Sequence, residues 1–219
     1  MITRVYLIRH GATTLSAEDR FAGASDVLLS DGGREQARLL GERLAGETID
    51  AFYASPMRRT IETASIVAAP HGKEVTPVDG FREIDHGRWE QKTRADVEVE
   101  FAEEYRRWEH DPYTFAPAGG ETGLAVTARA LPALLTLVER HAGRGFLVVS
   151  HKATIRLLLS SLLGFDPREY RDRLDMQPAA LNILDFKDEA HARLMVFNDT
   201  SHYSRVPEIA GRRLSKEWA

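Results

Sequence analysis

The sequence predicts an α/β fold, a three-layer sandwich in which a mostly parallel central sheet is flanked by helices and carries a lid insertion. Short runs of β-branched and aromatic residues alternate with longer stretches in which apolar residues recur at helical spacing. The run Gly145–Val149 is apolar throughout, which is typical of a strand buried on both faces. The chain has 219 residues, of which 43% are hydrophobic, so it can bury a sizeable core. We expect one domain over 1–219.

The first strand and the first helix are predicted near the N-terminus. Val5–Ile8 is β-branched, aromatic and short, so we expect a buried strand that ends at Arg9-His10-Gly11. A loop follows over 12–30. Ser30-Asp31-Gly32-Gly33 is typical of a helix start. The inward positions of that helix recur at helical spacing as Ala37, Leu40 and Leu44.

Two more strands are predicted before residue 80. Ala51–Ala54 is the second strand, and Ser55-Pro56 ends it and opens a helix, because proline is favourable just inside a helix start. The inward residues of this helix are expected to be Ile61, Ala64, Ile66 and Val67. Glu74–Val78 is predicted as a third, weaker strand.

The stretch from about Phe81 to Thr122 differs in composition from the rest of the chain. It is rich in charged and aromatic residues, and it contains a predicted helix at 94–108 and a Pro/Gly loop at 117–120. We interpret it as a lid insertion over about 84–120 rather than as a separate domain.

The C-terminal half is predicted to complete the sheet. A long helix at about 121–141 precedes the strand at 145–149, and a helix at about 154–163 follows it. Two last strands, 181–186 and 193–197, are expected to form a hairpin at the edge of the sheet.

Composition narrows the range of functions. The net charge is −4 and the pI is about 6.1, so we expect no nucleic-acid partner. The absence of cysteine excludes thiolate nucleophiles and cysteine-ligated zinc. The apolar run at the N-terminus is too short for a signal-peptide core, and no stretch approaches the roughly 18–20 apolar residues of a membrane span. We therefore expect a cytoplasmic protein with no membrane partner.

Four polar side chains follow the predicted strands. In parallel sheets, ligands bind beyond the carboxyl ends of the strands. His10 follows the first strand, and Arg59 lies one helical turn beyond the second. Glu83 follows the third strand, and His151 follows the strand at 145–149. We expect these four residues to converge at one edge of the sheet.

This set of residues suits phosphoryl transfer. Arg9 and Arg59 can bind phosphate oxygens through paired N–H groups. Neutral His10 can attack phosphorus with one ring nitrogen while a backbone carbonyl holds the other. His151 can supply a further donor, and Glu83 can protonate the leaving oxygen and then deprotonate the attacking water. Because arginines can stabilise the transferring group, no metal ion or other cofactor is predicted.

Five ordered segments resemble motifs of one family, the histidine phosphatase superfamily, which is also called phosphoglycerate-mutase-like. The segments are Leu7–Thr13, Ser55–Ala64, Arg82–Glu90, Gly119–Glu121 and Val148–His151. The resemblance covers nearly the whole chain. It implies that His10 is the nucleophile and Glu83 the proton donor, and the spacing of the second motif selects Arg59 rather than Arg58 for phosphate binding.

Within the family, the proton-donor segment resembles the phosphatase branch. It reads Glu83-Ile84-Asp85-His86-Gly87, where mutases normally have Glu-Arg-His-Tyr-Gly. This string and the later Arg107-Trp108 are similar to the metal-independent phosphoserine phosphatases. The resemblance implies that His86 contacts a carboxylate of the substrate, and His202 is a further candidate for substrate contact.

Thr13, Ser16 and Lys152 complete the predicted substrate-binding residues. Ser16 stands where many family members have Asn, and Ala22 stands where many have Gln, so the contacts of those side chains differ in this chain. After His151 the family often has Gly-Gly, whereas this chain has Lys152-Ala153. Lys152 either adds positive charge near the pocket or points to solvent.

Other enzyme classes lack their motifs in this sequence. There is no His-Glu-x-x-His zinc helix, no Gly-x-Ser-x-Gly elbow around Ser150 and no Walker motif. Two alternatives stay open: a phosphoglycerate mutase, and a non-catalytic phospho-ligand or protein-binding module on the same scaffold. The expected partner is a small phosphorylated metabolite, such as phosphoserine or a phosphoglycerate, and the base rate for oligomers favours a homodimer.

Overall fold

The computed structural model describes residues 1–15 and 20–204. Its described part contains one sheet in the strand order β3-β2-β4-β1-β5-β6. The strands are β1 Thr3–Arg9, β2 Ala51–Ala54, β3 Val75–Pro77, β4 Gly145–Ser150, β5 Leu181–Asp188 and β6 His191–Asp199. The α-helices of the described residues are α1 Asp31–Leu44, α2 Arg58–Ala68, α3 Arg94–Glu100, α4 Ala102–His110, α5 Gly123–Arg140, α6 Lys152–Leu163 and α7 Tyr170–Arg173.

The sheet is parallel over four neighbouring strands and antiparallel at one edge. β1 pairs in parallel with β4, β4 with β2, and β2 with β3. β5 runs antiparallel to β1, and β6 runs antiparallel to β5. The predicted mostly parallel sheet with a C-terminal hairpin at its edge is therefore confirmed.

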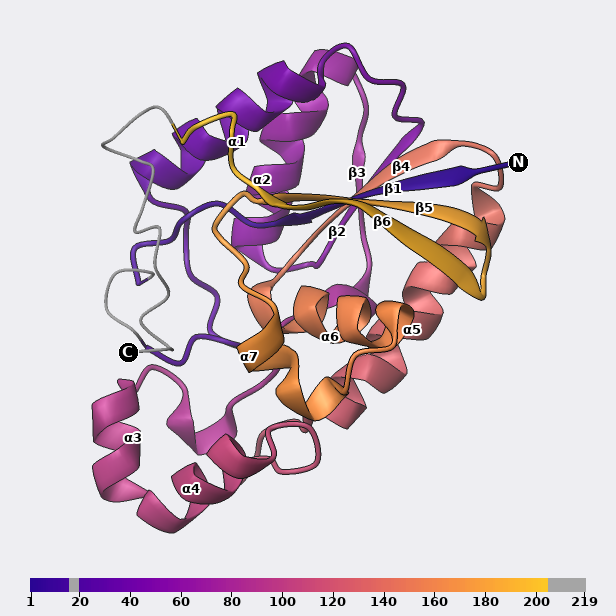
Figure 1. Cartoon of the computed structure of the whole chain (residues 1–219). Coiled ribbons are helices and arrows are strands. Elements are labelled where there is room, and N and C mark those ends of the chain that lie inside the picture. Colours follow the sequence, from indigo (N-terminus) through magenta and orange to yellow (C-terminus); the bar gives the residue numbers. More distant parts are fainter. Residues whose placement is uncertain (16–19, 205–219) are drawn as a thin grey trace.

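Helices cover both faces of the sheet, with α1 and α2 on one side and α5 and α6 on the other (Figure 1). Both faces need this cover because successive side chains of β1 point to opposite faces of the sheet and are apolar on each. Tyr6 and Ile8 pack into the apolar cluster that includes α1 and α2, whereas Val5 and Leu7 pack into the cluster that includes α5 and α6. Each such fully buried side chain contributes roughly 1.5–3 kcal/mol to folding. The predicted three-layer α/β sandwich is confirmed.

Residues 84–120 lie beyond the layers, on the side toward which the parallel strands point (Figure 1). The single helix predicted at 94–108 is wrong in detail, because the chain forms two helices, α3 and α4. They are separated at Phe101, whose backbone leaves the helical region at φ −130° and ψ 41°. The Cζ atom of Arg88 lies 4.3 Å from the centroid of the Phe101 ring. Packing of the Phe101 side chain therefore accompanies the break between α3 and α4.

The short helix α7 had no sequence signal, because four residues are too few to display a helical period. It follows α6 and carries Tyr170, which is buried against α6 residues such as Leu157. In the described part of the chain, no helix combines the length and the apolar character that crossing a membrane requires.

Candidate active site

A cavity of about 210 Å³ opens beyond the carboxyl ends of the parallel strands. His10 reaches it from the end of β1, and Arg59 reaches it from the first turn of α2. Glu83 lies in the segment after β3 and also lines the cavity. His151, which follows β4, is fully buried, with its ring centroid 5.2 Å from that of His10. The structure thus brings together the four side chains that the strand order predicted to converge.

His10 is held with one ring nitrogen available for chemistry. Its Nδ1 lies 2.8 Å from the carbonyl oxygen of Gly11. A carbonyl can only accept a hydrogen bond, so Nδ1 carries the proton and Nε2 has a free lone pair. Burial, together with the charges of Arg59 and Arg9, lowers the pKa of His10 well below its ordinary value. The imidazole is therefore neutral, as a nucleophile must be.

The loop after His10 is fixed by a close approach of two glycines. A Cβ on Gly11 would lie 2.4 Å from the carbonyl oxygen of Gly33, and a Cβ on Gly33 would lie 2.0 Å from the carbonyl oxygen of Ala12. Only glycine allows this contact between the loop and the first turn of α1. The Gly11 amide also donates to the Thr63 hydroxyl at 3.1 Å. The carbonyl that orients His10 is thereby anchored to α1 and α2.

Arg9 lies half-buried beside the nucleophile. Its Nη1 donates to the carbonyl of Met176 at 2.5 Å, and its Nε is buried with no hydrogen-bond partner among the described residues. Burial lowers the pKa of Arg9 to about 10, and the nearby charge of Arg156 acts in the same direction. The guanidinium stays charged at neutral pH. An anionic ligand would stabilise this half-buried cation by pairing with its charge.

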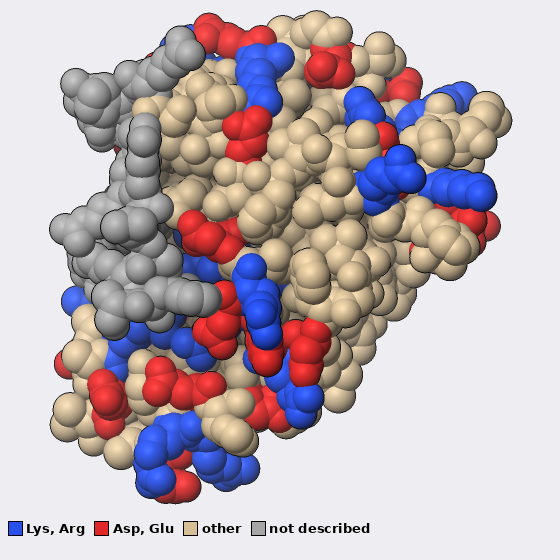
Figure 2. All heavy atoms as spheres, viewed as in Figure 1, with Lys and Arg blue, Asp and Glu red and all other residues tan. Residues whose placement is uncertain are grey.

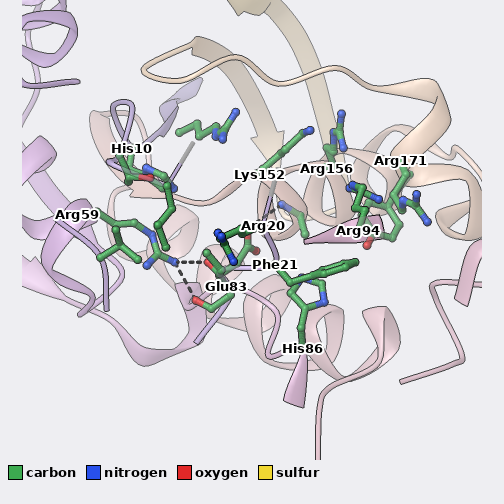
Figure 3. A pocket seen from close by; sticks show the side chains of 18 of the residues that line it. His10, Arg20, Phe21, Arg59, Glu83, His86, Arg94, Lys152, Arg156 and Arg171 are labelled. Atoms are coloured by element: carbon green, nitrogen blue, oxygen red, sulfur yellow. Dashed lines mark hydrogen bonds between the residues drawn. The ribbon is translucent and has the colours of Figure 1, made fainter. Parts of the chain in front are cut away.

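Arg59 is 2% exposed and holds a loop against the site. Its Nη1 donates to the Ser25 carbonyl at 2.7 Å. Its Nη2 donates to the Gly23 carbonyl at 2.9 Å (Figure 3). The same guanidinium also donates from Nε to Nδ1 of His151 at 3.2 Å. Arg59 therefore positions the loop and His151 as well as contributing positive charge to the cavity.

The tautomer of His151 follows from its two contacts. Because Arg59 is always a donor, Nδ1 of His151 must be unprotonated. Its Nε2–H then donates to the Ser55 hydroxyl at 2.8 Å. Burial and the charge of Arg59 lower the pKa of His151 well below its ordinary value, so the ring is neutral. Both ring nitrogens of His151 are thus engaged with protein groups before any ligand arrives.

Glu83 accepts hydrogen bonds from the N-terminus of α6. Its Oε2 accepts from the Ala153 amide at 3.1 Å, and its Oε1 accepts from the Thr154 amide at 3.1 Å and from the Thr154 hydroxyl at 3.0 Å. The Ile84 amide adds a further donor at 3.0 Å. These contacts fix the carboxyl group at the wall of the cavity.

A comparison with known families agrees with this geometry. Residues 5–200 match the histidine phosphatase superfamily, branch 1. The chain belongs to this family. The resemblance that the five motifs predicted is therefore confirmed.

Relatives of the histidine phosphatase superfamily place the chain among phosphatases. The phosphoserine phosphatase 1 of Hydrogenobacter thermophilus is 34% identical over 165 residues, which cover 75% of this chain and 78% of that protein. A probable phosphoglycerate mutase, GpmB of Salmonella choleraesuis, is 33% identical over 186 residues, covering 84% and 86%. The structure of Bacillus stearothermophilus YhfR matches with a TM-score of 0.85 at 30% identity, covering 91% of this chain and 98% of that one. The chain is a phosphatase of this family.

The other predicted contact residues divide between the cavity and the rest of the molecule. Thr13, Lys152 and His86 line the cavity. Ser16 lies outside the described residues. His202 is not among the described residues that line the cavity, and its ring packs edge-on against Tyr203 with centroids 4.8 Å apart. Burial lowers the pKa of His202 to about 4.

His86 lies in an aromatic corner of the cavity. Its ring centroid is 4.8 Å from that of Phe21 and 6.3 Å from that of Trp108. Its Nδ1 is buried and has no hydrogen-bond partner in the described part of the chain. Burial lowers the pKa of His86, so the ring is neutral and can donate one hydrogen bond.

Several lining residues were missed by sequence reasoning. They are Arg20, Phe21, Arg94, Trp108, Arg156, Tyr170 and Arg171. One signal was available, because Arg156 lies four residues after Lys152 on the helix that follows His151, and such residues share a helix face. The others come from the insertion, the N-terminal loop and α7, which only the folded chain brings to the cavity.

Ser55 is expected to act as a positioning residue for His151. Ser55→Ala removes the acceptor of the His151 Nε2–H, so we expect kcat on p-nitrophenyl phosphate to fall about tenfold, the scale of one buried hydrogen bond. Ser150→Ala is a matched control, because that buried hydroxyl donates to the Phe81 carbonyl instead. Ser55→Thr, which keeps the hydroxyl, should restore activity. Equal losses in both alanine variants would assign Ser55 a purely structural role.

Proposed function

We propose that this phosphatase hydrolyses a small phosphomonoester through a transient phosphohistidine on His10 and needs no metal ion. The observation that carries the proposal is the orientation of His10. Its Nδ1–H is committed to the Gly11 carbonyl, so Nε2 is the nucleophilic atom, and the charges of Arg9 and Arg59 act directly on the ring. A neutral imidazole beside two guanidinium groups is suited to attack a phosphate dianion.

In the first half-reaction, Nε2 of His10 forms a bond to phosphorus as the bond to the ester oxygen breaks. The leaving oxygen takes a proton from the Glu83 carboxyl group and departs as an alcohol. Arg9 and Arg59 stabilise the charge on the non-bridging phosphoryl oxygens. The carbonyl of Gly11 holds the Nδ1–H throughout, so it supports the positive charge that develops on the ring.

In the second half-reaction, water attacks the phosphohistidine. Glu83, now a carboxylate, removes a proton from this water as the N–P bond breaks. The electron pair of that bond returns to Nε2, which leaves neutral His10 and inorganic phosphate. Glu83 is again protonated, so the cycle is closed without any further reactant.

A phosphoester of a small carboxylic acid, such as phosphoserine or a phosphoglycerate, fits the proposal. The cavity volume of about 210 Å³ lies below the roughly 300–1,000 Å³ of sites for drug-sized ligands, which favours a compact substrate. The relative named as a phosphoserine phosphatase supports the same class. Residues 84–120 contribute His86, Arg94 and Trp108 to the cavity wall, so we propose that this insertion acts as a lid that selects the substrate.

The test is turnover of a phosphomonoester panel in ¹⁸O-labelled water with EDTA present. We expect inorganic phosphate that carries solvent oxygen, at a rate that the chelator does not change. A mutase, the activity named for the Salmonella relative, would move the phosphoryl group between two hydroxyl groups of one substrate and need a bisphosphorylated primer. No turnover of any ester would favour the non-catalytic binding module, and turnover only with added metal would contradict the metal-independent mechanism.

A further inference from the structure

The segment between α7 and β5, residues 175–180, contacts the end of β1 at two points. The Met176 carbonyl accepts from Nη1 of Arg9 at 2.5 Å, and the Ala179 amide donates to the His10 carbonyl at 3.0 Å. One short segment therefore holds both the proposed nucleophile and the arginine beside it. The orientation of this segment affects where the Arg9 guanidinium points.

Both contacts are made by buried residues of the segment. Met176 and Ala179 are fully buried. Charged side chains at the surface are in a different situation, since basic and acidic groups are interspersed on the face shown in Figure 2 and water can replace their contacts at little cost. A buried carbonyl or amide has no such substitute. A group that orients the 175–180 segment is therefore expected to influence the active site.

One peptide unit connects Arg9 to Asn198 on β6. Its carbonyl is that of Met176, and its N–H is that of Gln177, which donates to Oδ1 of Asn198 at 2.8 Å. A trans peptide is planar, and its C=O and N–H point in opposite directions. Fixing the N–H on Asn198 therefore fixes the direction of the carbonyl that Arg9 contacts. Two hydrogen bonds in series also polarise the peptide, which strengthens the carbonyl as an acceptor.

Asn198 is itself held in place by its backbone. Its φ is 48°, in the left-handed region that asparagine tolerates better than most residues. Its amide donates to Oδ1 of Asn182 at 2.9 Å, and Asn182 is fully buried and donates to the Leu7 carbonyl at 3.0 Å. Nδ2 of Asn198 lies 3.5 Å from a carboxylate oxygen of Asp175, which leaves Oδ1 to face the Gln177 amide.

We propose that Asn198 is a positioning residue for Arg9 and acts through the peptide unit between Met176 and Gln177. Asn198 is not among the described residues that line the cavity, so it acts without touching the substrate. The inference rests on the proposed function, in which Arg9 binds the phosphoryl group. Asn198 also lies outside the five motifs that predicted the active site.

The first test replaces Asn198 with glycine, which accepts the left-handed backbone but has no side-chain oxygen. We expect kcat/KM for p-nitrophenyl phosphate to fall about tenfold, the scale of one buried hydrogen bond. Asn198→Asp keeps an oxygen toward the Gln177 amide, so it should retain more activity than Asn198→Gly. Gln91→Gly is the matched control, because Gln91 is also left-handed, at φ 67°, but is exposed. Wild-type kcat/KM in Asn198→Gly would overturn the proposal.

A double-mutant cycle separates positioning of Arg9 from a general effect on folding. Calorimetry with inorganic phosphate measures affinity without turnover. With Arg9 present, Asn198→Gly should weaken phosphate binding about tenfold. In an Arg9→Gln background it should weaken binding by less than about twofold, because the guanidinium that it positions is gone. Equal losses in the two backgrounds would show that Asn198 acts independently of Arg9 and would reject the proposal.

A second variant and a second measurement keep the cycle decisive. Asn198→Ser has a side chain one atom shorter, and it replaces Asn198→Gly in the cycle if the glycine variant does not fold. If the wild type hydrolyses esters but its phosphate binding is too weak for calorimetry, the same cycle is measured in kcat/KM, with the same two expectations.

The two readouts distinguish this inference from the proposed function. If the protein binds phosphate but hydrolyses no ester, the proposed function fails, whereas the binding cycle still decides on Asn198. If esters are hydrolysed and the losses are equal in both backgrounds, the proposed function stands and the positioning role fails. Neither turnover nor phosphate binding in the folded wild type would reject both.

Discussion

Replacing His10 with alanine is expected to reduce kcat for every phosphomonoester by roughly 10⁴–10⁶, the scale seen when an enzyme loses its nucleophile. The variant has no nitrogen to bond phosphorus, so the two-step route is closed, although Arg9 and Arg59 remain in place. Rapid mixing with substrate, followed by an alkaline quench, should trap an acid-labile, base-stable phosphoenzyme in the wild type. The His10→Ala variant should form none.

His110→Ala is the control for this prediction, since His110 is an exposed histidine at the end of α4. It should keep wild-type turnover and the phosphoenzyme. His10→Gln fills the site with a neutral polar group of similar size, so it guards against a folding defect caused by the smaller alanine. Normal turnover by either folded His10 variant would show that the phosphoryl group does not pass through this imidazole.

The strands and the residues that follow them were predictable because their signals are local. β4 is apolar over consecutive positions, and it places His151 after its last residue whatever the rest of the chain does. α1 begins where Ser30 was expected to cap it, with the serine hydroxyl accepting from the Gly33 amide at 3.1 Å. Since parallel strands share a carboxyl edge, the convergence of the side chains that follow β1 and β4 required only the order of the elements.

The far end of the cavity was not predictable, because its residues meet only through tertiary packing. Arg94 and Trp108 lie on two helices whose separation at Phe101 left no mark in the sequence pattern. Arg171 lies on a helix of four residues. The tautomer of His151 also depends on a distant group, the Ser55 hydroxyl, which follows a different strand. Local sequence patterns indicate which residues are polar, but they do not predict which polar groups contact one another in the folded chain.

Glu83→Gln is expected to slow formation of the phosphoenzyme by roughly 10²–10⁴ for alkyl phosphates, the scale of general acid catalysis. Glutamine cannot donate a proton to an alkoxide. Nitrophenolate needs no proton to leave, so phosphorylation by p-nitrophenyl phosphate should change far less. Hydrolysis of the phosphohistidine should still be slow, because the attacking water has lost its base. Stopped-flow measurement should therefore show a burst of nitrophenol followed by slow steady-state turnover.

Glu90→Gln provides a closely matched control. Glu90 also accepts several backbone hydrogen bonds, from Gly23, Ala24 and His86 at 3.0–3.1 Å, but it does not line the cavity. Because its carboxylate orders the same loop that Arg59 holds, any loss in Glu90→Gln should be similar for good and poor leaving groups. If the loss of rate depends steeply on the leaving group in Glu83→Gln and not in Glu90→Gln, that result would show that Glu83→Gln has lost proton transfer rather than loop order. Equal slowing of alkyl and nitrophenyl phosphates in Glu83→Gln would remove Glu83 from the proton-donor role.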